Sequence, residues 1–173
     1  MIKNPQTLAI NTFLKGPPFS VLFGYKTNAQ KTYFLNDIID TSFMLRKQVI
    51  YVDTFSNFIQ LWEKPENLIV ISPFDMSLQQ FFSTLLCCPR GSVIVIDSYP
   101  FIINAFFEEE EKADRFFMYL LAKTKHFLHI VVFVYFDSEK GIPSFPIFEK
   151  RFYDKFIINR NAKASLLNIG TES

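Results

Sequence analysis

The sequence predicts one α/β domain in which a mainly parallel β-sheet is flanked by helices and ends in a C-terminal antiparallel hairpin. Three observations predict this fold: short β-branched and aromatic runs recur, amphipathic stretches separate them, and two further strand-like runs lie near the end of the chain. A length of 173 residues suits a single domain with a sizeable core, so we expect one domain over residues 1–173.

Five runs have the nearly unbroken apolar character of strands that are buried on both faces, whereas the strands of a β-sandwich would alternate. They are residues 20–23, 49–53, 68–71, 93–97 and 130–135. The hairpin is expected from residues 156–159 and 165–169, which a turn-prone segment joins.

Apolar residues at helical spacing predict three helices between these strands. One covers residues 78–86, with Asp75 placed to cap its start, and one covers residues 113–124 after the four glutamates at 108–111. A weaker stripe over residues 35–42 predicts a helix directly after the first strand. Residues 137–148 carry one glycine and two prolines, so we expect a loop there.

Composition and charge restrict the function. The chain is 49% hydrophobic with 22 phenylalanines, so some rings are expected outside the core, where they would mark a partner surface. The formal net charge is +1, so any contact with nucleic acid must be local. No apolar run reaches the ~18 residues of a membrane span, and the first 15 residues do not read as an export signal.

The cysteines and histidines do not predict a metal or redox site. Cys87 and Cys88 are adjacent, which disfavours an unstrained disulfide and indicates a reducing compartment. His126 and His129 straddle the end of a predicted helix without a cluster of zinc ligands around them, so we expect surface or packing roles.

A degenerate phosphate-binding loop is the first candidate site. The segment from residue 23 to 32 leaves the first strand and enters a helix, and Gly24, Lys31 and Thr32 match such a loop in kind. The spacing is one residue too long, and Gln30 stands where a glycine should precede the lysine. An ordinary first helical turn with a solvated lysine is the alternative reading.

Asp97 is the second candidate. It follows four apolar residues at the end of a strand, where a carboxylate beside the phosphate loop can hold the hydration shell of Mg²⁺. The alternative is a polar residue that only ends a buried strand.

Together these features resemble the RecA-like recombinases, in particular the paralogues of archaeal RadA and of the eukaryotic strand-exchange proteins. The degenerate Walker A segment, the strand VIYVDTFSNF and the Walker B strand VIVIDSYPFI follow in the family's order, and the likeness covers roughly residues 15–170. Active members carry a glutamate after the second strand that activates water. Phe55 occupies the matching position, and its ring cannot accept a proton.

A mixture of cations and aromatic rings after the fifth strand is the candidate DNA surface, because such mixtures suit single-stranded DNA. In the resembled family this loop faces DNA. The candidate residues are Lys140, Phe148, Lys150, Arg151, Phe152 and Lys155. An ordinary solvated loop whose rings pack inward is the alternative.

The resemblance implies a noncatalytic recombinase paralogue, a pseudo-ATPase that needs no cofactor and works in a heteromeric, Shu-type complex. It would assist recombinase assembly on single-stranded DNA in homologous recombination and repair, with another paralogue or the recombinase itself as partner. Such a protein would be nuclear in a eukaryote and cytoplasmic in an archaeon. Two rivals remain: an NTPase or nucleotide switch that still binds ATP and Mg²⁺, and a doubly wound protein-interaction module without a link to recombination.

Overall fold

The computed structural model describes residues 14–15, 20–25, 27–54, 66–97, 99–136, 154–158 and 164–168. Their strands form a seven-stranded sheet in the order β3-β2-β4-β5-β1-β6-β7. Neighbouring strands are parallel except for the last pair, β6 and β7, which is antiparallel. The bounds are β1 (Ser20–Tyr25), β2 (Val49–Asp53), β3 (Leu68–Ile71), β4 (Val93–Asp97), β5 (Ile130–Phe136), β6 (Asp154–Ile158) and β7 (Ala164–Asn168). The predicted parallel sheet and its terminal hairpin are confirmed.

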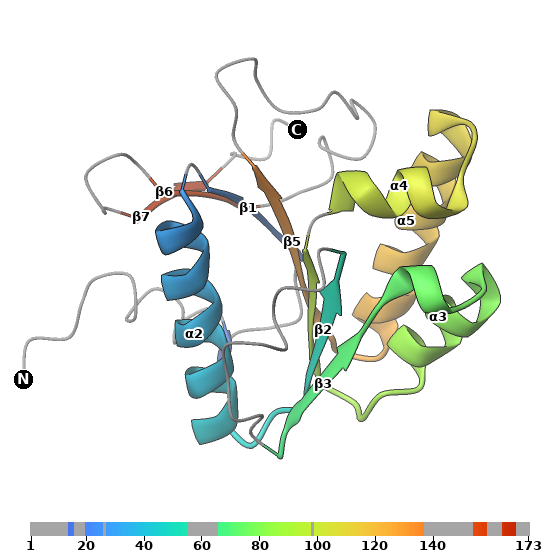
Figure 1. Ribbon diagram of the computed structural model, residues 1–173. Helices are drawn as coiled ribbons and strands as arrows, with labels where there is room; N and C mark the ends of the chain where they lie inside the picture. The colour runs from blue at the N-terminus through green and yellow to red at the C-terminus, as the bar shows by residue number, and fades with distance from the viewer. Residues whose placement is uncertain are drawn as a thin grey trace, which may run out of the picture.

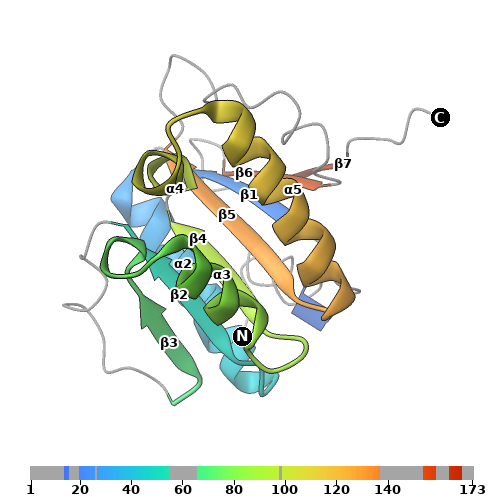
Figure 2. The same ribbon diagram turned by 90° about the vertical axis from the view of Figure 1, so that its right-hand side faces the viewer.

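The helices cover both faces of the sheet. Helix α2 (Asn28–Met44) lies against one face, and α3 (Leu78–Leu86), α4 (Tyr99–Phe106) and α5 (Glu110–His126) lie against the other (Figures 1 and 2). None of the described helices combines the length and the apolar character that crossing a bilayer would need.

The two faces of the sheet hold separate cores, because side chains along a strand alternate between faces. On the α2 side, Tyr51 and Val95 pack with Phe34. On the other side, Ile50 and Ile96 pack with residues that include Phe81, Phe117 and Phe133. Burial on both faces explains why the central strands are apolar along their whole length.

Polar side chains cap the N-termini of α2 and α3. Thr27 caps α2, because its side-chain oxygen accepts a hydrogen bond from the Gln30 amide at 3.2 Å. Ser77 and Gln80 form a reciprocal capping box at α3. The prediction that Asp75 caps α3 is wrong: Asp75 ends the 3-10 helix η2 (Pro73–Asp75), and the helix starts after Ser77.

Some element bounds differ from those that the sequence predicts. Strand β1 continues two residues beyond the predicted end, because Gly24 stays paired with both β5 and β6 and Tyr25 stays paired with β5. Helix α4 is not predicted. Its sequence, YPFIINAF, begins next to a proline, which a first helical turn tolerates, and is too uniformly apolar for a helical stripe to be visible.

Candidate functional site

Two carboxylates meet at the edge of the sheet where β2 and β4 end. Asp53 and Asp97 are opposite each other in the parallel register, and both side chains belong to buried residues. Each lies two residues beyond a member of the α2-side core, Tyr51 or Val95, so both carboxylates lie on the face that α2 covers.

Asp97 is held by three neighbours. Its Oδ2 lies 3.0 Å from Lys31 Nζ and also accepts a hydrogen bond from the Tyr51 hydroxyl. Its backbone oxygen accepts hydrogen bonds from the backbone amide and the hydroxyl of Thr54, each at 2.9 Å. The other carboxylate oxygen, Oδ1, is buried and has no hydrogen-bond partner among the described residues.

Lys31 reaches Asp97 from the first turn of α2. Its ammonium also lies over the ring of Tyr25, 5.2 Å from the centroid, in a cation–π contact. Only 16% of the lysine side chain is exposed, and only 1% of the Asp97 side chain. This arrangement differs from the solvated lysine of the alternative reading, because the charge is shared between a buried carboxylate and an aromatic face.

Burial dominates the electrostatics of this cluster. It raises the pKa of Asp97 above its ordinary value of 3.8, although Lys31 and the Tyr51 hydroxyl oppose that change by favouring the charged form. Burial, and then the charge of Asp97, raises the pKa of Tyr25 to about 12. The same two causes, in that order, raise the pKa of Tyr51 further still. The two phenols therefore remain protonated around neutral pH.

The turn between β1 and α2 is short. Only residues 26 and 27 separate the strand from the helix. Gly24 lies inside β1, opposite Tyr135 in β5 and Ile157 in β6, and not in a turn. Thr27 binds two amides of the first turn, because its hydroxyl accepts a hydrogen bond from the Gln30 amide and its carbonyl accepts one from the Lys31 amide.

The connection between β1 and α2 differs from a phosphate-binding loop in its length. A phosphate-binding loop needs several consecutive amides directed at the anion, from the loop itself and from the first turn of the helix that follows it. Here the chain passes from strand pairing to helix capping within two residues. Of the predicted site residues, Lys31 and Asp97 are brought together, whereas Thr32 is a partly buried residue of α2 that is not among the hydrogen-bond partners of Asp97 in the described part of the chain.

Sequence reasoning missed Tyr25, Tyr51 and Thr54. Tyr51 carried a signal, since a strand places it on the same face as Asp53, two residues later. The sequence places Tyr25 in a loop, and this placement does not predict which groups its ring contacts.

The DNA candidates Lys140, Phe148, Lys150, Arg151 and Phe152 lie outside the described residues. The backbone of Lys155 lies in β6, next to β1.

The described histidines and cysteines form no metal site. His126 is exposed and His129 is buried, with its Nε2 3.5 Å from Cys88 Sγ, and both thiols are free. Within the described ranges, no three His, Cys, Asp or Glu side chains are grouped so that they could bind a metal ion.

The fold is RecA-like. Neither protein-family models nor curated protein sequences match this chain. Among solved structures, it is similar to a KaiC-like protein of the hyperthermophilic archaeon Pyrococcus horikoshii, with a TM-score of 0.60. The two sequences are 14% identical, and the match covers 87% of this chain and 76% of the other. At that identity the similarity defines the fold and leaves the activity open.

The raised pKa of Asp97 predicts a pH-dependent stability difference between the protein and its Asp97→Asn variant. The protonated carboxyl favours the fold, so its contribution is complete below pH 3.8 and is lost as the pH rises through the folded-state pKa. Asparagine stays neutral. We therefore expect the melting temperature of Asp97→Asn minus that of the parent to increase as the pH rises above 3.8. The difference should become constant once the pH exceeds the folded-state pKa of Asp97.

Circular dichroism melts between pH 3 and pH 8 measure this difference. Asp40→Asn, which changes an exposed carboxylate on α2, is the matched control and should give a flat difference. A difference for Asp97→Asn that shrinks as the pH rises would contradict the assigned direction.

Proposed function

We propose that this chain is a RecA-like recombinase paralogue that does not hydrolyse ATP. It acts as a subunit of a heteromeric complex that assists a true recombinase to assemble on single-stranded DNA. The recombination role rests on the sequence resemblance, and the loss of hydrolysis rests on the site. The proposed location is the nucleus of a eukaryote or the cytoplasm of an archaeon.

The ion pair between Lys31 and Asp97 is the observation that carries the proposal. An active site of this class uses the lysine for phosphate charge and the aspartate for the hydrated metal, so both must be available to the ligand. Here the two groups neutralise each other at 3.0 Å within a buried cluster. A nucleotide would have to break this contact and also open a capped, two-residue turn.

Exposed apolar side chains support a role through partners. Tyr33, Phe43, Met44 and Phe74 are each more than half exposed, at 69, 57, 68 and 58%. Large apolar groups at such exposure are typical of surfaces that another protein covers.

Isothermal titration calorimetry with ATP and Mg²⁺ tests the loss of nucleotide binding. We expect no binding tighter than about millimolar, because ligand contacts would have to replace a buried ion pair. Lys31→Ala should leave the flat titration unchanged. The rival nucleotide switch is favoured by the unpartnered Oδ1 of Asp97. Binding in the micromolar range that Lys31→Ala abolishes would establish the rival and refute our proposal.

Salt dependence tests the DNA surface. Each phosphate contact on a single strand contributes about 0.7 to the slope of log K against log salt. If Lys150 and Arg151 contact phosphates, replacing both with alanine should reduce the magnitude of the slope by about 1.4. Fluorescence anisotropy with labelled oligo(dT) measures it. Lys112→Ala with Arg115→Ala, which removes two cations from the start of α5, is the matched control. An unchanged slope in the 150/151 variant would exclude direct contact by these residues.

A further inference from the structure

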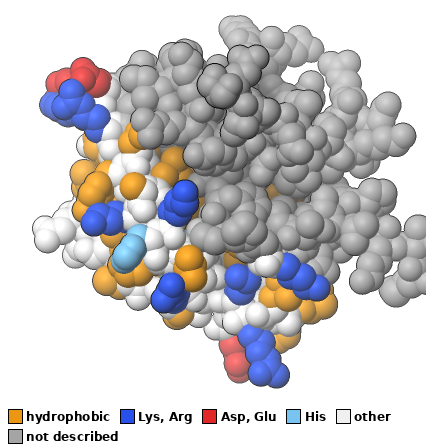
Figure 3. All heavy atoms as spheres, turned by 180° about the vertical axis from the view of Figure 1, so that it is seen from behind, with side chains coloured by type: hydrophobic (Ala, Val, Ile, Leu, Met, Phe, Trp, Pro, Cys, Tyr) orange, Lys and Arg blue, Asp and Glu red, His pale blue; other side chains and the backbone are white. Residues whose placement is uncertain are grey.

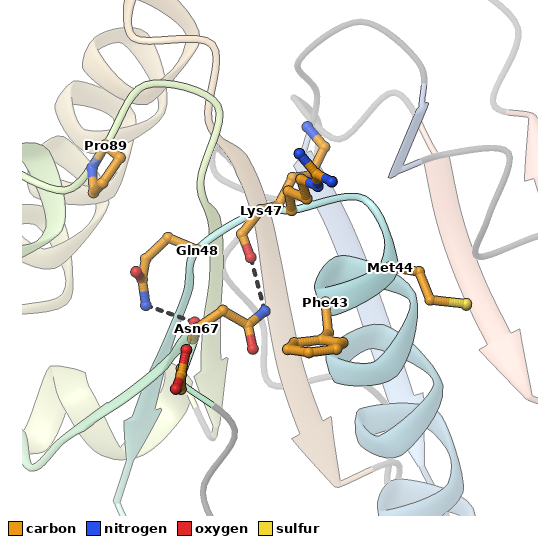
Figure 4. Close-up of a pocket in the computed structure, with 8 residues that line it drawn as sticks. Phe43, Met44, Lys47, Gln48, Asn67 and Pro89 are labelled. Atoms are coloured by element: carbon orange, nitrogen blue, oxygen red, sulfur yellow. Dashed lines mark hydrogen bonds between the residues drawn. The ribbon is translucent and has the colours of Figure 1, made fainter.

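A groove lies at the edge of the sheet opposite to Lys31 and Asp97, where α2 ends and β2 and β3 begin. Its volume is about 630 Å³, and Phe43, Met44, Arg46, Lys47, Asn67 and Pro89 contribute to its lining (Figure 4). Phe43 and Met44 are 57% and 68% exposed. The groove therefore offers apolar surface and positive charge to the solvent side by side.

At this edge of the sheet, two non-glycine residues have a positive φ. After α2, Arg46 has a φ of 55°, and after α5, Leu128 has a φ of 60°. Both follow the helix in a Schellman motif: Lys47 N binds Ser42 O, and His129 N binds Thr124 O, each at 2.9 Å. Glycine adopts this left-handed conformation without strain, and Gly91, in the turn over residues 89–92, is the described glycine with a positive φ. At position 46, glycine would adopt this backbone conformation at an equal or lower energetic cost than arginine.

Positive charge continues along this edge beyond the groove. Arg46, Arg90 and Lys125 are exposed, and Lys47 is partly buried, with its Nζ 3.3 Å from Gly91 O. The turns are also joined by the hydrogen bond from Gly91 N to Phe127 O. Figure 3 shows Lys and Arg side chains set among hydrophobic ones on one face of the molecule. Among the residues that line the groove, Glu66 is the acidic one.

Asn67 distinguishes between possible ligands of such a surface. Its Nδ2 donates to Lys47 O at 2.8 Å, whereas its Oδ1 is buried and has no partner among the described residues. A buried acceptor without a donor is costly, so a ligand that brings an N–H group would relieve that cost once the exposed Phe43 ring has moved aside. Peptide amides supply such donors along a whole chain, but the phosphates of a nucleic acid backbone only accept.

We propose that this groove binds a peptide segment of a partner protein that carries acidic side chains next to an apolar anchor. The anchor packs on Phe43 and Met44, the acidic side chains pair with Arg46 and Lys47, and a peptide N–H satisfies Asn67. Charge complementarity and the unpartnered carbonyl identify the occupant. The inference does not depend on the recombination role, because it uses neither the Lys31–Asp97 cluster nor the DNA candidates.

Phage display of random 12-residue peptides against the immobilised full chain tests this inference. We expect the enriched peptides to carry Asp or Glu beside a large apolar residue. A synthetic, fluorescein-labelled copy of the best peptide is then titrated with the protein and its variants by fluorescence polarisation.

Arg46→Gly removes the cation and also relieves the strain of the left-handed backbone conformation at this position. It should weaken peptide binding about tenfold, the loss expected for a charge-assisted contact, and should leave the melting temperature equal or higher. Leu128→Gly is the matched control, because it relieves the same backbone strain outside the groove and should keep the affinity. Met44→Ser should also weaken binding.

Several outcomes would overturn the inference. They are the absence of enriched peptides, enriched peptides without acidic residues, and full affinity in Arg46→Gly. Binding of a 20-residue oligo(dT) that Arg46→Gly weakens would make nucleic acid the occupant. If sedimentation shows that the protein is a dimer and that Arg46→Gly dissociates it, the occupant of the groove would be a second copy of this chain.

Discussion

A buried carboxylate has to be satisfied inside the protein, and much of the local structure around Asp97 follows from this constraint. The strand β4 ends with a carboxyl group whose side chain is 1% exposed, and two elements and the residue that follows β2 supply the partners of Asp97. Helix α2 contributes the Lys31 ammonium, strand β2 contributes the Tyr51 hydroxyl, and Thr54 holds the backbone oxygen. Truncating one member of such a set leaves a buried charge without its partner, so we expect this cluster to stabilise the contact between α2 and β4.

The same contacts engage the two side chains that a nucleotide site of this fold would use. The positions at which a lysine and an aspartate would meet phosphate and metal are kept, but the two side chains meet each other. Strand pairing continues through Gly24, and Thr27 caps α2, so only residues 26 and 27 connect the two elements. The Tyr25 ring contacts the Lys31 ammonium, and the Tyr51 hydroxyl donates to Asp97. The Lys31–Asp97 pair links helix α2 to the end of strand β4.

The sequence predicts most of the sheet because central parallel strands are apolar on both faces, and the runs 49–53, 68–71 and 93–97 match the observed strands. The helix ends were less predictable. Asp75 and Ser77 are both good caps, and only the 3-10 helix before Met76 decides between them. Lys31 and Asp97 were each identified as site residues. The sequence does not predict their direct pairing, because the two residues are 66 positions apart and the contact depends on how α2 lies on the sheet.

A double-mutant cycle on Lys31 and Asp97 tests the central claim most directly. Unfolding free energies of the parent, Lys31→Met, Asp97→Asn and the double variant are measured by urea denaturation at pH 7. We predict a favourable coupling free energy between Lys31 and Asp97 of roughly 0.5 to 3 kcal/mol, the range found for residues in one buried network. We also predict that Lys31→Met costs less stability when Asp97 is already neutral. Additive effects would mean that the two groups do not hold each other, and the closed site would have no physical basis.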